Sequence, residues 1–186
     1  MTPTIKKIVL IGPESTGKTS LCEKLANHFN TEWVKEQARS YLNTNGKEYT
    51  LSDLDKIALE QIQREEEVIG LMKQNKSIGS NNMPVVFIDT DLYVLKVWSE
   101  IVFNECSNKI LHEIALRNYD LYLLCEPDIP WVKDELREHP NETMRIKIFH
   151  HFKDAMINQH TPWESINGNF EERLTKAIKA VNQLFV

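Results

Sequence analysis

Short runs of apolar residues recur along the chain and predict the strands of a sheet. Residues 5–11, 85–88, 121–125 and 163–166 are apolar segments bounded by charged or turn-forming residues, and residues 31–34 form a fifth. Runs of this length without strict alternation are typical of strands that are buried on both faces. We therefore expect a mainly parallel sheet of five strands.

Apolar residues at helical spacing lie between these segments. One set follows the first strand, and a longer set precedes the strand at 85–88; they are Leu21, Leu25 and Phe29, then Leu54, Ile57, Ala58, Ile62, Ile69 and Met72. The last helix begins after Asn169, a suitable N-cap, and has an apolar face from Phe170 to Phe185. Strands that alternate with helices predict right-handed crossovers and a three-layer α/β fold, here a single domain over residues 1–186.

Polar and turn-forming residues separate these elements. Residues 43–49, 75–83 and 139–143 are predicted loops. Thr50, followed by Asp53 three residues later, is typical of a capped helix start.

Composition and charge narrow the class of protein. The 186 residues are 41% hydrophobic and 26% charged, which excludes a disordered or collagen-like chain. The net charge is −5 and the basic residues form no block, so nucleic-acid binding is not favoured. The three cysteines, Cys22, Cys106 and Cys125, are odd in number and form no CxxC pair. Residues 5–11 are too short and too charged to span a membrane. We expect a soluble cytoplasmic protein.

One segment after the first strand has a specific chemical signature. Gly12-Pro13-Glu14-Ser15-Thr16-Gly17-Lys18-Thr19 matches the pattern GxxxxGK followed by Ser or Thr, and it opens a predicted amphipathic helix. A loop around a polyphosphate must turn its N–H groups inward, and glycine leaves room for this. We expect residues 12–19, with Ser20, to bind ATP, Lys18 to contact the β- and γ-phosphates, and Thr19 to bind Mg²⁺.

A carboxylate at the end of a second buried strand would complete the metal site. Asp89 follows residues 85–88 and is the expected metal-ordering residue. Thr90 comes next, where motor-type ATPases commonly have a glutamate that polarises water, and Asp91 follows. This pattern favours transfer to a bound acceptor over hydrolysis.

Phosphoryl transfer also needs cations near the migrating group and a lid that excludes water. Residues 131–153 are locally basic, and Arg137 and Arg145 flank a short polar loop. We expect a small helical lid, the lid segment, at about residues 131–150. The alternative is a pair of solvated amphipathic helices.

The tight turn at residues 166–169 is a candidate adenine site. Its backbone and Asn167 could meet the edge of the base. The same turn would also serve simply to start the last helix.

Several of these segments together resemble the ribosylnicotinamide kinase domain of NadR-type NAD-biosynthesis proteins, within the P-loop nucleoside and nucleotide kinases. The resemblance covers nearly the whole chain. It rests on residues 12–19, Glu36-Gln37-Ala38-Arg39, Phe87-Ile88-Asp89-Thr90-Asp91, and Trp131-Val132-Lys133-Asp134-Glu135-Leu136-Arg137 with Arg145 beyond.

This resemblance implies an ATP-dependent kinase that phosphorylates the 5′-hydroxyl of nicotinamide riboside, with Mg²⁺ as cofactor. It implies lid arginines at Arg137 and Arg145. Trp131 is the candidate ring for stacking on a cationic nicotinamide, with packing of the lid as the alternative. Glu36 and Asp91 compete for the role of the group that accepts the hydroxyl proton. Arg39 either orients Glu36 or contacts substrate phosphate.

Two departures from the family pattern concern the acceptor. NadR-type proteins often carry an adenylyltransferase domain, and no HxGH pattern occurs here, so nucleotidyl transfer is not implied. Residues 96–111 also lack a glycine-containing segment that follows the Asp-Thr-Asp motif in the family. A kinase for another nucleoside or small metabolite, and a regulatory P-loop ATPase, therefore stay open. A GTPase is disfavoured, because residues 75–78 and 108–111 begin with Asn-Lys but lack the aspartate of the guanine motif.

Overall fold

The structure is a computed structural model that describes residues 4–74, 84–137 and 140–186. In these ranges the chain forms one five-stranded sheet whose paired strands are all parallel, in the order β2-β3-β1-β4-β5. The strands are β1 (Lys6–Ile11), β2 (Trp33–Val34), β3 (Val85–Asp89), β4 (Leu121–Cys125) and β5 (Trp163–Ile166). The predicted five-stranded parallel sheet is confirmed, and the segment at 31–34 contributes the shortest strand.

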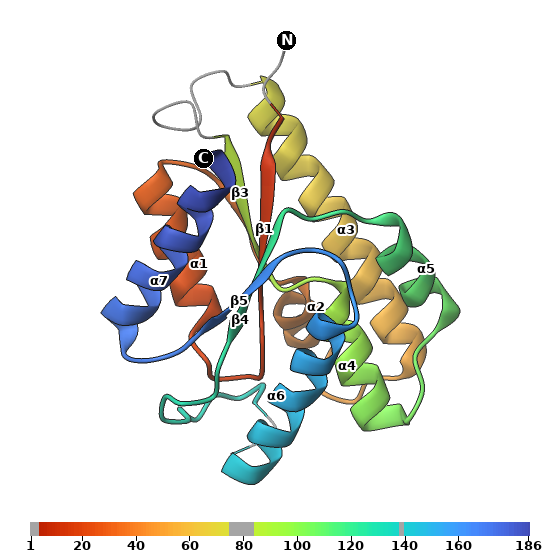
Figure 1. Ribbon diagram of the computed structural model, residues 1–186. Helices are drawn as coiled ribbons and strands as arrows, with labels where there is room; N and C mark the ends of the chain where they lie inside the picture. Colours follow the sequence, from red (N-terminus) through yellow and green to blue (C-terminus); the bar gives the residue numbers. More distant parts are fainter. Residues whose placement is uncertain (1–3, 75–83, 138–139) are drawn as a thin grey trace.

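Helices cover both faces of the sheet (Figure 1). They are α1 (Lys18–Phe29), α2 (Gln37–Asn45), α3 (Leu51–Gln74), α4 (Leu92–Phe103), α5 (Asn108–Leu116), α6 (Glu142–Ile157) and α7 (Phe170–Asn182), and a 3₁₀ turn follows at Gln183–Phe185. Helices α1 and α7 lie on one face, and α3, α4 and α6 on the other. The three-layer α/β prediction is confirmed.

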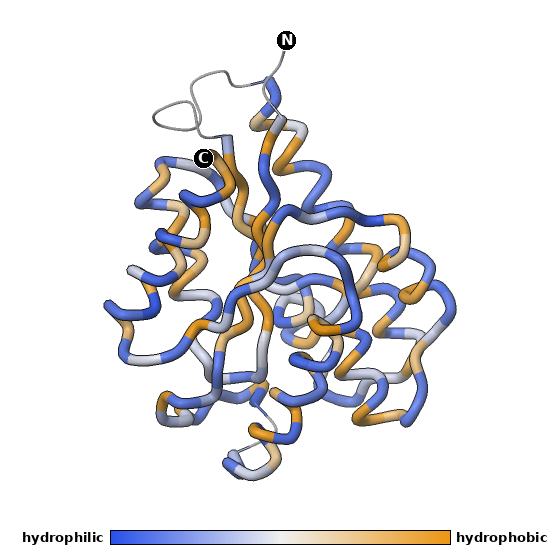
Figure 2. Tube along the Cα trace, viewed as in Figure 1, coloured by the Kyte–Doolittle hydropathy of each residue, from blue (hydrophilic) through white to orange (hydrophobic). Residues whose placement is uncertain are grey.

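The alternation of side chains along β1 explains these two layers. Ile8 and Leu10 point into the core under α1 and α7, whereas Val9 and Ile11 point to the opposite core. Figure 2 shows the result, with hydrophobic strands through the centre and hydrophilic residues on the outer helical surfaces. A smaller cluster joins α2, α3, α4 and α5 beside the sheet.

Local signals behave mostly as expected. Asn169 Oδ1 accepts hydrogen bonds from the N–H groups of Glu171 and Glu172, and Glu172 bonds back to the N–H of Asn169, which completes a capping box. Asp53 accepts from the N–H of Thr50 at 2.9 Å, but the Thr50 hydroxyl also donates to that carboxylate. Only the carboxylate half of the expected cap therefore matches the prediction.

Two predicted boundaries need correction. Helix α2 continues to Asn45, so the segment 43–49 begins as helix rather than loop. In the described part of the lid segment, residues 131–137 form a loop with one turn, and the helix, α6, begins at Glu142. The predicted loops at 75–83 and 139–143 lie wholly or partly outside the described residues.

The order of strands locates the crevice in which a ligand is expected. The chain passes from β1 to β2 and β3 on one side, and then to β4 and β5 on the other. The carboxyl end of β1 is therefore the topological switch point, where open α/β sheets bind ligands. The segment that follows β1 is residues 12–19.

Across the described parts of the chain, no helix has the length and apolar character needed to cross a bilayer.

Candidate active site

The phosphate loop, residues 12–19, joins β1 to α1. Gly12 has φ 137°, and a Cβ there would lie 2.4 Å from the carbonyl oxygen of Cys125, so only glycine fits against the end of β4. Gly17 has φ 77° and is the N-cap of α1. A glycine cap has no side chain to bond the first N–H groups of the helix, which leaves them available to an anion.

Lys18 lies across this loop. Its ammonium donates to the carbonyl oxygens of Gly12 at 3.0 Å and Pro13 at 2.9 Å. The Thr16 hydroxyl donates to the same Pro13 oxygen at 2.8 Å. These bonds curve the loop around the Lys18 ammonium, and a loop of this kind can hold an anion.

Thr19 and Asp89 are brought together from α1 and β3. The Thr19 hydroxyl donates to Asp89 Oδ2 at 2.6 Å. Asp89 is 1% exposed, and among the described residues its Oδ1 has no hydrogen-bond partner. Burial raises the pKa of Asp89, and the charge of Lys18 offsets part of this rise. A hydroxyl beside a carboxylate oxygen without a partner fits Mg²⁺, which prefers oxygen ligands and keeps several waters and phosphates.

Glu36 and Arg39 enter the same cavity from the start of α2. Glu36 is the N-cap residue of α2 but makes no side-chain capping bond, so its carboxylate is not committed to the helix. Burial and the nearby Asp89 carboxylate raise the pKa of Glu36 above its ordinary value. The cations of Lys18 and Arg39 offset part of that rise. Glu36 is thus a carboxylate beside the phosphate loop whose proton affinity is increased, as suits a general base.

Arg39 connects the cavity to the lid segment. Its Nη1 donates to both carboxylate oxygens of Asp134 at 3.1 Å. The N–H of Leu136 also donates to Asp134, and the two contacts lower the pKa of that carboxyl. Arg39 therefore links α2 to the lid segment in this structure.

The carboxylate of Asp91 binds structural partners and does not line the described cavity. Its Oδ1 accepts from the N–H of Tyr93 at 3.0 Å as the N-cap of α4, and its Oδ2 accepts from the Tyr122 hydroxyl at 2.7 Å. It is 3% exposed and is not among the described residues that line the cavity. Burial raises the pKa of Asp91 to about 7. Both oxygens are engaged in structural bonds, which favours Glu36 as the base.

The lid segment meets the phosphate loop at three points. The Trp131 indole N–H donates to Glu14 at 3.0 Å, and the N–H of Val132 donates to the Ser15 hydroxyl at 2.9 Å. Arg145 Nη2 donates to the carbonyl oxygen of Ser15 at 3.3 Å. Arg137 contacts the carbonyl of Val132 and lines the cavity.

Trp131 and Arg145 therefore differ from the other predicted lid residues. Neither belongs to the cavity lining described here. Arg145 is 3% exposed, burial lowers its pKa, and within the described ranges its Nε is unpaired. In this structure both residues hydrogen-bond to the phosphate loop, Trp131 to Glu14 and Arg145 to the Ser15 carbonyl.

The cavity itself has a volume of about 230 Å³. Its lining includes residues 12–20 and the charged residues Glu36, Arg39 and Arg137. The remaining lining residues are apolar, and we call them the apolar lobe; they are Ala38, Leu42, Val94, Val97, Trp98, Ile101, Leu136, Ile148 and Phe152. A cavity with both a phosphate loop and apolar walls has the chemistry to hold a phosphate donor and a ring-bearing acceptor.

Trp98 is a lining residue that the sequence patterns did not single out. Its Nε1 donates to the Tyr49 hydroxyl at 2.8 Å, and the two rings meet edge to face. This bond fixes the indole in the wall of the apolar lobe. The helical spacing on α4 marks Trp98 as apolar core, and the packing of α4 against α3, α5 and α6 makes it a cavity wall.

Comparison with known proteins identifies the family. A family model described as an AAA domain (AAA_28) matches residues 7–173. The chain belongs to this AAA domain family.

Sequence relatives of this AAA domain are NAD-biosynthesis proteins. The trifunctional NAD biosynthesis/regulator protein NadR of Salmonella typhimurium is 31% identical over 160 residues, which are 84% of this chain and 36% of that protein. The protein of the same name from Escherichia coli K12 is 34% identical over 137 residues, 72% of this chain and 31% of the relative. The chain thus spans about a third of the length of these curated relatives.

Solved structures show the fold of the AAA domain to be that of P-loop kinases. A crystal structure of NadR protein in complex with NR has a TM-score of 0.71 at 22% identity, covering 97% of this chain and 49% of that chain. Thymidylate kinase from Ehrlichia chaffeensis has a TM-score of 0.64 at 13% identity, covering 96% of this chain and all of the other.

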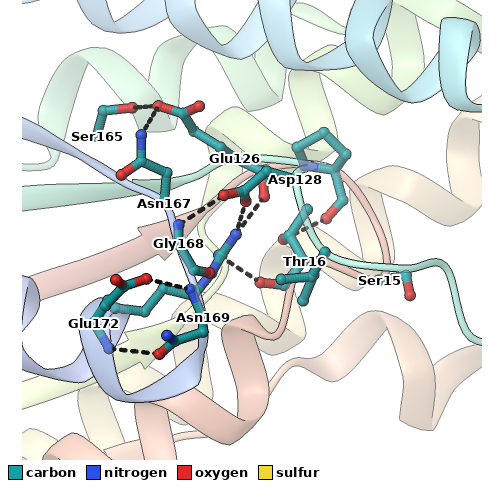
Figure 3. Close-up of polar contacts among 12 residues, drawn as sticks. Ser15, Thr16, Glu126, Asp128, Ser165, Asn167, Gly168, Asn169 and Glu172 are labelled. Carbon is teal, nitrogen blue, oxygen red and sulfur yellow. Dashed lines mark hydrogen bonds and ion pairs between the residues drawn. The ribbon is translucent and has the colours of Figure 1, made fainter.

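The candidate adenine turn of this AAA domain, residues 166–169, follows β5 and contributes no residue to the described cavity lining. The Asn167 amide donates to Glu126 at 3.3 Å (Figure 3). Lys176 contacts the Asn167 side-chain oxygen. The side chain of Asn167 is thus engaged with its neighbours. Any contact with a base at this turn would fall to the backbone.

Proposed function

We propose that this AAA domain transfers the γ-phosphoryl group of ATP to the 5′-hydroxyl of nicotinamide riboside. The observation that carries the proposal is that one cavity is lined by the phosphate loop, by Glu36 and Arg39, and by the apolar lobe. The relatives named NadR, and a NadR structure in complex with NR, support this choice of acceptor.

The donor would be held by the phosphate loop. Its N–H groups and Lys18 would bind the β- and γ-phosphates, and Arg137, which lines the same cavity, would add a further cation. Thr19 and Asp89 would hold Mg²⁺, which when bound neutralises charge on the phosphate oxygens.

The acceptor would lie with its ring in the apolar lobe and its hydroxyl toward Glu36. The carboxylate of Glu36 would accept the proton as the hydroxyl oxygen attacks the γ-phosphorus, while the bond from phosphorus to the β–γ bridging oxygen breaks and ADP leaves. Trp98 presents an indole to the ring, and an indole face attracts a cationic pyridinium. We assign ring recognition to Trp98 rather than to Trp131, since Trp98 lines the lobe.

A regulatory ATPase would have no need of an acceptor site. The apolar lobe and the threonine after Asp89 both favour a kinase over a nucleotide switch. A kinase for a different nucleoside would use the same lobe, so the acceptor must be determined directly.

The test is phosphoryl transfer from γ-labelled ATP to a panel of nucleosides. We expect a labelled product with nicotinamide riboside, and ATP turnover that depends on the added acceptor. Activity on uridine or deoxynucleosides with none on nicotinamide riboside would refute the acceptor. ATP turnover that does not increase with any added acceptor would refute the assignment as a kinase. Lys18→Ala is the control for contaminating kinases.

A further inference from the structure

Arg173 is a buried arginine in the first turn of α7 that the proposed reaction does not use. It is 2% exposed and lies near the positive end of the helix dipole, where a cation is unfavourable. A buried charge at such a position requires strong compensating contacts. The acceptors that provide them belong to three separate segments of the chain.

The guanidinium of Arg173 donates to each of these segments. Nε donates to the carbonyl oxygen of Gly168 at 2.8 Å, and Nη2 to that of Glu126 at 3.0 Å. Nη2 also pairs with the Asp128 carboxylate. Nη1 donates to the carbonyl oxygen of Thr16 in the phosphate loop at 3.1 Å. Figure 3 shows Thr16, Asp128 and Gly168 converging on this point.

The bond to Thr16 has a consequence for the phosphate loop. A trans peptide is planar, so the carbonyl of Thr16 and the N–H of Gly17 point in opposite directions. Arg173 binds the carbonyl from the outer side and thereby directs the Gly17 N–H away from itself, into the cradle. Arg145 makes the corresponding contact with Ser15, the preceding carbonyl.

The other contacts tie this peptide to two further loops. Glu126 and Asp128 follow β4, and Gly168 follows β5, so both loops lie at the carboxyl edge of the sheet beside the phosphate loop. Asp128 also accepts from the N–H of Gly168 at 2.6 Å. The guanidinium is the shared centre of the three segments.

We propose that Arg173 is a positioning residue for the donor nucleotide, which sets the affinity for the triphosphate by fixing the Thr16–Gly17 peptide relative to the loops after β4 and β5. The inference rests on the proposed function only in taking ATP as the donor. Arg173 does not touch the phosphates; it acts through the peptide that does.

The experiment separates this role from general stabilisation. Mg·ATP and Mg·tripolyphosphate are titrated calorimetrically into the wild type, Arg173→Met and Arg173→Lys, and the thermal midpoint of each protein is measured. Arg117→Met is the matched control, because Arg117 also pairs with carboxylates, those of Glu66 and Glu113, and is outside the described cavity lining.

We expect Arg173→Met to weaken both ligands by about tenfold or more, since hydrogen bonds from a charged group are lost. Lysine can keep the ion pair with Asp128 but cannot reproduce the fork of donors. Arg173→Lys should therefore recover thermal stability without recovering affinity. Arg117→Met should lower stability and leave both affinities within twofold of the wild type.

Two results would overturn the inference. The first is wild-type affinity in either Arg173 variant, which includes recovery of affinity in parallel with stability in Arg173→Lys. The second is an equal loss of affinity in Arg117→Met. If the wild type does not bind ATP, ATP is not the donor, and the inference about Arg173 fails as well. A wild type that binds ATP but does not phosphorylate nicotinamide riboside would fail the proposed function, while the titrations still decide the role of Arg173.

Discussion

The indole N–H of Trp131 donates a hydrogen bond to a carboxylate oxygen of Glu14 at 3.0 Å. This bond joins the lid segment to the phosphate loop, and the N–H of Val132 adds a second link to Ser15 at 2.9 Å. Trp131 is thus engaged with the donor side, while Trp98 lines the apolar lobe. Substitution of Trp131 should therefore change the KM for ATP, and substitution of Trp98 the KM for the acceptor.

Trp131→Leu should raise the KM for ATP by about threefold to tenfold, the value of one lost hydrogen bond, and leave the acceptor KM unchanged. Trp98→Leu should raise the acceptor KM by a similar factor and leave the KM for ATP unchanged, because an aromatic contact with the acceptor is lost. Steady-state kinetics with each substrate varied in turn is the measurement. A larger acceptor effect in the Trp131 variant would restore the stacking role that the sequence suggested.

Lys18→Ala should lower kcat by about a hundredfold to a thousandfold, as expected when a donor to the transferred group is removed. Among the described residues, the hydrogen bonds of Lys18 go to the carbonyls of Gly12 and Pro13 within the phosphate loop, so the thermal midpoint should change little. Transfer is followed with labelled ATP and folding by circular dichroism. Retained turnover in a pure variant would contradict the assignment.

Glu36→Gln should lower kcat by about a hundredfold to ten-thousandfold, the usual contribution of a general base, with ATP affinity little changed. Asp91→Asn is the matched variant, since asparagine can still cap α4, and it should retain most of the activity. Kinetics over a range of pH compares the two. If Asp91→Asn were the inactive variant and Glu36→Gln the active one, the base would be Asp91.

Asp91 should also make stability depend on pH. In the folded state its pKa is raised to about 7, so the folded protein keeps a proton there that the unfolded chain releases at lower pH. The unfolded state then binds fewer protons between about pH 4 and 7, and the free energy of unfolding falls as pH rises through this window.

Asp91→Asn lacks this titration, so its stability relative to the wild type should increase between pH 5 and pH 8. Urea unfolding at both values measures the difference. Asp53→Asn is the control, because hydrogen bonds lower the pKa of Asp53 and it does not titrate in this range. A constant difference for Asp91→Asn across the range would show that Asp91 is ionised throughout.

The strands could be predicted because they are buried on both faces, and continuous apolar runs record that burial directly. The conformation of the lid segment could not be predicted from the sequence. Its charge pattern at 131–137 fits a helix or a loop equally, and the loop form follows from contacts with Glu14, Ser15 and Arg39, which are more than 90 residues away.

The sequence by itself determined the phosphate loop, the strands and the capped final helix, because each depends on neighbouring residues and on backbone conformations that glycine or asparagine permits. Only the tertiary structure decided which distant side chains share the cavity. Asp91 and Trp131 have suitable chemistry for a substrate site, but Tyr122 and Glu14 engage them elsewhere. In the sequence, Trp98 is simply an apolar residue of a helix, and Arg173 a charged one. Packing between elements far apart in the chain gives each its position at the site.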